Sequence, residues 1–388
     1  MEPRLTIVMP LKGRHLFTFR CLWHANELRP PYRFLLADGL VREEVARRLE
    51  DSRSLFPHLD IEYVRYPDDT ELSRFFVKMA DAYARVRTPY VMNMDNDDFA
   101  GFWGIEHALD FLDTNQDFIC ARGRSVGFSV FSWSGGSDGG LCGKLNQFKA
   151  NHKYQDITAA TPAERLRQGG LCHATYSAVF RTEAAALIWR EMAEINFSDL
   201  MLQENFCALR TLTLGKVHMN KKTVSKYPQA RTGISYRPTR DWASHFLRSR
   251  FTTDVHAMIE RLASAAAGTN GAVEAAVTGD VRAILESYYQ EYLSAIYGVP
   301  VRIKRALSRK WPLLANVVQG RPRVSIWRER AELYSQLKRA GASAEDIRHV
   351  REELTVVERA LSREAFAKYA GPLLSLVKST GSRDWLYI

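Results

Sequence analysis

The chain has 388 residues, 46% of them hydrophobic, and a formal net charge of +10 at neutral pH. This length suffices for one large domain with its own core plus a smaller one. The cysteines are odd in number, widely spaced and without a C-x-x-C pair, which argues against a zinc ribbon or a disulfide framework and indicates a reducing compartment; they are Cys21, Cys120, Cys142, Cys172 and Cys207.

The first hundred residues alternate short apolar runs with longer helical patterns. Strands are predicted at about 5–10, 32–38, 61–66 and 90–94, with helices after them through about 26, from 41, from 71 to 86 and from about 102. This alternation predicts βαβ units, and therefore an α/β fold with a mainly parallel sheet flanked by helices. We expect residues 1–240 to form this domain.

The fourth predicted strand ends in three carboxylates, Asp95, Asp97 and Asp98. Alternate residues of an extended segment point the same way, so Asp95 and Asp97 can converge on one hard cation. Mutual repulsion makes such a cluster costly without a cation, a basic partner or a raised pKa. The alternative is a polar turn in which Asp97 or Asp98 caps the next helix.

Three motifs occur in order: T-I-V-M-P-L-K-G-R from Thr6, L-L-A-D-G from Leu35, and Y-V-M-N-M-D-N-D-D-F from Tyr90. Together they resemble glycosyltransferases of the GT-A fold, similar to family 2. By position, the resemblance implies nucleotide contacts from Pro10, Leu11, Arg14, Asp38 and Asp95, and divalent metal ligands in Asp95, Asp97 and Asp98. Ala37 departs from the family, which often has an Asp there.

The implied activity is a metal-dependent, inverting glycosyltransferase that uses a nucleoside-diphosphate sugar, with a UDP-sugar favoured. Mn²⁺ or Mg²⁺ would neutralise the charge that develops on the diphosphate leaving group. Arg14 and Lys12 could contact the phosphates. The acceptor would be a hydroxyl of a glycan or a lipid-linked molecule, in bacterial-type surface polysaccharide or glycolipid assembly.

An inverting transfer needs a base that takes the proton of the acceptor hydroxyl. The segment 196–206 lies where the family carries its Glu-Asp motif, before a helix that runs to about Leu214. Glu204 is the first candidate, and Asp199 stays open because Asn205 occupies the usual Asp position. Either acid could instead stabilise a helix start.

Two histidines and a glycine complete the candidate residues. His173 and Gly170 lie in a glycine turn before a predicted strand at 176–181, and such a turn suits contact with an acceptor or sugar. His218 ends a short predicted strand, and some GT-A enzymes use a histidine near the end of the core as a further metal ligand. For both histidines a structural role is the alternative.

The Gly/Ser-rich run 132–140 predicts a loop, which could cover the donor and acceptor or be a surface insertion. From about Asp241 helical periodicity replaces the alternation, with helices expected at 254–267, 271–297, 328–340 and 344–369. Residues 241–388 are therefore predicted to form a helical C-terminal domain.

Residues 299–323 carry many basic side chains and no acid. They predict a basic amphipathic helix that packs on the catalytic domain or lies on an anionic membrane surface. A nucleic-acid patch ranks last because no nucleic-acid motif accompanies the charge. With no leader and no apolar run long enough to span a bilayer, we expect a cytoplasmic protein, able to associate with the inner membrane face.

Two further classes stay open. A nucleotidylyltransferase would share the sheet and the acidic site but usually opens with a Gly-rich phosphate loop, where this chain has Gly13 alone. A non-catalytic binding protein could keep the fold and use its basic tail for a partner. The sequence does not indicate an oligomeric state.

Overall fold

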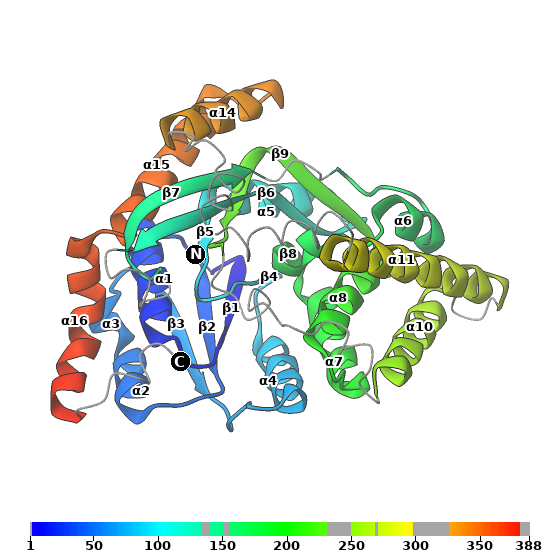
Figure 1. The fold of residues 1–388 in the computed structure, drawn as a ribbon, viewed down its shortest axis with the longest axis horizontal. Helices are drawn as coiled ribbons and strands as arrows, with labels where there is room; N and C mark the ends of the chain where they lie inside the picture. The colour runs from blue at the N-terminus through cyan, green and yellow to red at the C-terminus, as the bar shows by residue number, and fades with distance from the viewer. Residues whose placement is uncertain are drawn as a thin grey trace, which may run out of the picture.

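A computed structural model of the chain describes residues 2–132, 140–150, 155–230, 250–267, 271–297 and 326–380. Its centre is one mixed sheet with the strand order β3-β2-β1-β4-β8-β6-β9-β5, and β7 pairs with β6 (Figure 1). The strands are β1 (Leu5–Leu11), β2 (Arg33–Asp38), β3 (Asp60–Arg65), β4 (Tyr90–Asn93), β5 (Phe99–Ala100), β6 (Phe118–Ser132), β7 (Gly143–Ala150), β8 (Val179–Arg181) and β9 (Lys216–Tyr227).

The first four strands are parallel to one another, which confirms the predicted α/β class with helices flanking the sheet. Strand β8 runs antiparallel to β4 and to β6, and β9 runs parallel to β6 and antiparallel to β5. The carboxyl ends of β1, β2 and β4 therefore meet at one edge, where open sheets of this kind bind ligands.

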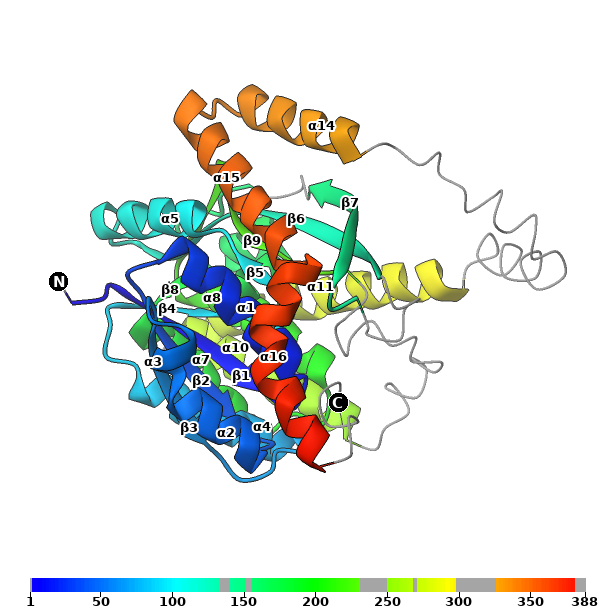
Figure 2. The same cartoon turned by 90° about the vertical axis from the view of Figure 1, so that its left-hand side faces the viewer.

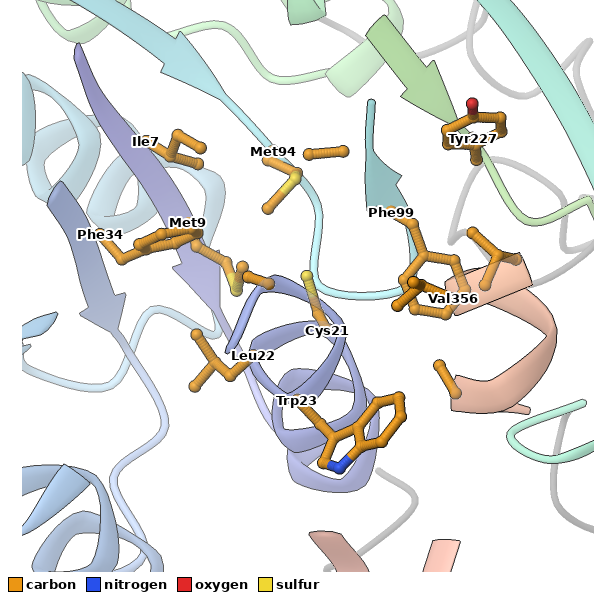
Figure 3. Packing of buried hydrophobic residues seen from close by; sticks show 14 of the residues in the cluster. Ile7, Met9, Cys21, Leu22, Trp23, Phe34, Met94, Phe99, Tyr227 and Val356 are labelled. Carbon is orange, nitrogen blue, oxygen red and sulfur yellow. The ribbon is translucent and has the colours of Figure 1, made fainter. Parts of the chain in front are cut away.

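Alternation along the strands explains why both faces of the sheet are covered. In β1, Ile7 and Met9 belong to one buried hydrophobic cluster and Val8 belongs to the other. In β4, Met92 and Val91 divide in the same way. Figure 3 shows part of the first cluster, in which side chains of β1 and α1 lie near Phe99, Tyr227 and Val356. Strands that are buried on both faces read as continuous apolar runs, as the sequence does here.

The helices divide between the two clusters. The first contains side chains of α1 (His15–Leu28), α2 (Glu43–Glu50) and α5 (Phe102–Thr114), and α3 (Ser52–Leu55) packs against it. The second contains side chains of α4 (Leu72–Arg85), α6 (Pro162–Gly169), α7 (Thr182–Ile195) and α8 (Leu200–Leu214). A 3-10 helix, η1 (His173–Ser177), comes before β8.

Helices beyond residue 240 also divide between these clusters rather than share one of their own. Helices α10 (Phe251–Ala267) and α11 (Gly271–Tyr297) complete the second, while α14 (Ile326–Arg339), α15 (Ala344–Ala360) and α16 (Arg363–Thr380) complete the first. Figures 1 and 2 show the two groups on different sides of the molecule, with α16 beside α1. The division of the chain into two domains at 240 stays a prediction.

Strand β6 and its hairpin partner β7 were not predicted. Ser132, the first residue of the predicted loop, belongs to β6, and residues 133–139 lie outside the described part. The basic segment 299–323 also lies outside it. Strand β9 continues nine residues beyond His218, where the sequence predicted its end. No helix in the described ranges is long and apolar enough to cross a membrane.

Helix α5 passes so close to β9 that a side chain has no room at Gly104. A Cβ there would lie 2.2 Å from the backbone oxygen of Val224, whereas a Cβ at Gly279, on α11, would meet nothing within 4 Å. We expect Gly104→Ala to lower the free energy of unfolding by about 1–3 kcal/mol through overpacking. Gly279→Ala should raise it by about 0.5–1 kcal/mol, because alanine is the better helix former. Urea unfolding of both variants checks this, and equal effects would contradict the close packing of α5 on β9.

Candidate active site

The three carboxylates lie in a tight turn between β4 and β5. The Asp98 amide donates to the carbonyl of Asp95 at 3.3 Å, and the buried Asn96 side chain donates to Thr18 on α1 at 3.0 Å. The turn gives the acids different surroundings: the Asp95 side chain is 43% exposed, while those of Asp97 and Asp98 are almost fully buried. Asp95 is therefore the carboxylate that a solute can reach.

Asp97 is held by two arginines of the first βα unit. The Arg14 guanidinium donates to Asp97 Oδ2 at 3.1 Å, and the fully buried Arg20 donates to the Asp97 carbonyl at 2.7 Å. Arg14 begins α1 in the left-handed region, at φ 52°, which is uncommon for a residue with a side chain. Its guanidinium also lies over the Phe17 ring. Arg14 is thus at the predicted edge, directed at the acidic turn.

Asp98 is paired with a lysine that the sequence did not single out. Lys226, near the end of β9, places Nζ 2.8 Å from Asp98 Oδ2 and 3.7 Å from Asp95 Oδ2. The amide of Gln229 donates to Asp98 Oδ1 at 2.9 Å. Burial by itself would lower the pKa of Lys226, but Asp98 and Asp95 raise it above its ordinary value, so the ammonium stays charged.

These pairings decide how well the turn fits the divalent ion that the sequence predicted. Mg²⁺ and Mn²⁺ need several oxygen ligands converging on one point. Asp97 and Asp98 are instead directed at Arg14 and Lys226, and among the described residues no three Asp, Glu, His or Cys side chains are arranged to hold a metal ion. The arrangement therefore does not fit a three-carboxylate metal site, and only Asp95 is open to an entering ion.

Helix α8 distinguishes the two candidate bases. Asp199 is its N-cap, with a buried carboxylate that accepts from the Met201 amide at 2.8 Å, which is the helix-start role that the sequence left open. Glu204 lies one turn further on and is partly exposed. Burial raises the pKa of Glu204 to about 7, and the nearby Asp95 adds to this while Lys226 opposes it. Glu204 thus lies within electrostatic reach of the acidic turn.

Two of the predicted nucleotide contacts, Asp38 and Leu11, already have hydrogen-bond partners within the protein. Asp38 is fully buried, and its two carboxylate oxygens accept from the Leu40 amide at 3.0 Å and the Tyr63 hydroxyl at 2.7 Å. The Leu11 carbonyl accepts from the buried Lys78 ammonium at 3.1 Å. Asp38 and Leu11 therefore support the ends of β2 and β1 through these hydrogen bonds.

Beside them, the sequence analysis missed a buried ion pair. Lys78 on α4 pairs with Asp69, whose carboxylate lies against Gly39, where a Cβ would be 2.3 Å from Asp69 Cγ. Lys12 donates to the Asp69 carbonyl at 2.8 Å. The one sequence signal for this pair is a lysine on the apolar side of α4, and no local spacing links Lys78 to Asp69.

The remaining predicted site residues do not all lie near the acidic turn. Pro10 is partly buried at the end of β1 and lies at the predicted edge. Gly170 ends α6 at φ 53°, with open space where a Cβ would be, and His173 opens η1, which packs on α8 and β4. His218 lies at the other end of β9 from Lys226, where it pairs with Asp156 at 3.1 Å and stacks on Phe111. The strand places His218 away from the turn, so the structure does not bring this predicted metal ligand together with the three carboxylates.

No protein-family model matches the chain, and no curated protein matches it. Among solved structures, S. aureus TarS residues 1–349 is similar at 10% identity and a TM-score of 0.39, over 74% of this chain and 92% of that one. TarS was also solved with UDP-GlcNAc. The mannosyltransferase PcManGT of Pyrobaculum calidifontis, in complex with GDP-Man and Mn²⁺, has the same identity and TM-score over 88% and 86% of the two chains. Similarities of this size do not establish an activity for this chain.

The raised pKa of Glu204 makes stability depend on pH. The folded state holds the Glu204 proton up to about pH 7, whereas the ordinary pKa of a glutamate is 4.5. The contribution of this proton to stability is therefore complete below about pH 4.5 and is lost as the pH rises through 7. Glu204→Gln removes this titration. The difference in free energy of unfolding between this variant and the wild type should therefore shift in favour of the variant by on the order of 2 kcal/mol between pH 5 and pH 8. Denaturant unfolding at both pH values measures this.

Glu286→Gln, at an exposed position on α11, is the matched control. Its difference in stability from the wild type should be the same at the two pH values. An equally constant difference for Glu204→Gln would contradict the environment described for Glu204.

Proposed function

We propose that the chain is an inverting glycosyltransferase that moves a sugar from a nucleoside diphosphate to an acceptor hydroxyl. The observation that carries this proposal is the electrostatic coupling of Glu204, a carboxyl with a pKa near 7, to Asp95 and Lys226 of the acidic turn, where Arg14 supplies a second paired cation. A base and fixed positive charge at one site are what transfer from a diphosphate requires.

Glu204 would accept the proton of the acceptor hydroxyl while its oxygen forms a bond to the anomeric carbon. The bond from that carbon to the phosphate oxygen breaks, and the electron pair leaves with the diphosphate. Arg14 and Lys226 would then face the charge that develops on the phosphates. A base whose pKa is close to the operating pH combines a deprotonated resting state with useful basicity.

The donor would be a UDP-sugar, and the acceptor a glycan or lipid-linked hydroxyl of surface polysaccharide or glycolipid assembly, as the sequence resemblance implies. His173 and Gly170 would contact the acceptor or sugar from the turn before β8. The Mn²⁺ or Mg²⁺ of that resemblance would have to enter through Asp95, since the other two carboxylates are paired. Lewis-acid stabilisation of the leaving group is the chemistry such an ion would supply.

Donor binding can be tested without knowing the sugar. Thermal stability would be measured against UDP, GDP, CMP and TDP, each with EDTA and with Mn²⁺. A nucleotide that binds only the folded protein should add about 2.7 kcal/mol at 100 times its Kd. We expect one nucleotide, UDP, to stabilise the protein. Stabilisation by none of the four in either buffer would contradict the proposed donor site.

Replacement of the proposed base separates chemistry from binding. Glu204→Gln keeps the shape of the side chain but cannot accept the proton, so transfer should fall by about 10²–10⁴-fold while UDP stabilisation is retained. Release of UDP from a panel of UDP-sugars, with water or a simple glycoside as acceptor, provides the rate. Glu286→Gln should be as active as the wild type. Full activity in Glu204→Gln would exclude this residue as the base.

A further inference from the structure

Lys226 occupies the place in the acidic turn where a cation is needed. It is buried on β9, and its ammonium lies between the closed carboxylate of Asp98, at 2.8 Å, and the open carboxylate of Asp95, at 3.7 Å. Strand pairing with Ala100 fixes its backbone beside the turn. The sheet therefore holds this charge in a set position.

A divalent ion and this ammonium would compete for the same oxygens. Inner-sphere ligands of Mg²⁺ lie about 2.0–2.1 Å from the ion, so an ion on Asp98 would displace Lys226 from its pair. Displacement would leave the buried ammonium without its carboxylate partner, and an uncompensated buried charge is strongly destabilising. Asp97 offers no alternative ligand while Arg14 holds it at 3.1 Å.

The ammonium also has capacity to bind a ligand. A lysine has three N–H donors, and its contacts in the turn are to Asp98 at 2.8 Å and to Asp95 at the longer 3.7 Å. The Asp95 side is the exposed one, so a phosphate that binds the largely buried ammonium would approach it past the Asp95 carboxylate.

We propose that the Lys226 ammonium takes the place of a divalent cation in this site and binds the diphosphate of the donor. This inference rests on the proposed function. When the bond between the anomeric carbon and the phosphate oxygen breaks, the electron pair stays on the diphosphate, and Lys226 and Arg14 neutralise it. Glu204 takes the proton of the acceptor, so the step balances without a metal ion.

The first test is calorimetric titration of the full chain with UDP, in EDTA and in Mn²⁺. For the wild type we expect the two Kd values to agree within about threefold, whereas Lys226→Met should weaken UDP binding in EDTA by about tenfold or more. Mn²⁺ should restore part of the loss, because Asp98 and Asp95 are then free to coordinate it. Lys221→Met, at an exposed position on the same strand, is the control and should bind as the wild type does.

A second measurement uses Mn²⁺ alone, followed by electron paramagnetic resonance, and needs no nucleotide. The wild type should leave Mn²⁺ free and Lys226→Met should bind it. Because Lys226→Met leaves Asp98 without its cation, the double variant Lys226→Met/Asp98→Asn, which removes both charges, shows whether the fold tolerates loss of the lysine. It should fold, bind no Mn²⁺ and bind UDP as weakly in either buffer as Lys226→Met does in EDTA.

The outcomes are distinguishable. Binding of UDP by the wild type only in the presence of Mn²⁺, tight Mn²⁺ binding to the free wild type, or undiminished UDP binding by a folded Lys226 variant in EDTA would each overturn the role of Lys226 and leave the proposed transferase standing. Failure of all four nucleotides to bind the wild type in either buffer would overturn the proposed function, and the Lys226 inference with it.

Discussion

Charge compensation at the end of β4 is the constraint on which the arrangement of the site depends. Two buried carboxylates and one open one lie within a single turn, and burial without partners would be very costly. The cations come from distant parts of the chain: Arg14 and Arg20 from the first βα unit, and Lys226 from the last strand. The turn can form only when β1, β4 and β9 are assembled, so the same ion pairs that neutralise the acids also hold the edge of the sheet together.

Local pattern was sufficient for the first four strands and for the helices α10, α11 and α14, and insufficient for β6, β7 and most of β9. The strands β1 to β4 and their helices follow from apolar runs of strand length separated by helical periodicity, which are properties of neighbouring residues. The β6–β7 hairpin was missed because its turn region is rich in Gly and Ser, and β9 was cut short at His218 because polar residues follow it. Those polar residues include Lys226, whose burial is explained by its partners in space and not by its neighbours in sequence.

Some residues of the candidate site could likewise be found from local sequence, whereas their roles could not. The acidic turn and Arg14 were found from short motifs, and Glu204 was found because segment 196–206 lies where the resembled family carries its Glu-Asp motif; the helix expected after this segment begins within it, at Leu200. Which acid would cap α8 and which would face the turn depended on side-chain direction, and only the structure separates Asp199 from Glu204. The expectation that Asp95 and Asp97 share a face assumed an extended segment. The segment is instead a tight turn, so alternation did not apply and the carboxylates received different partners.

Helix α15, which comes late in the chain, packs against α5 and β9, which come much earlier. Its buried Glu353 accepts from the Trp103 amide at the start of α5 and from the Tyr227 hydroxyl beside Lys226, both at 2.8 Å. During synthesis from the N-terminus, α5 and β9 leave the ribosome long before α15 does. The apolar surface that α15 covers therefore stays exposed until residues 344–360 have been translated. A nascent chain that exposes apolar surface in this way is prone to aggregation until α15 is in place.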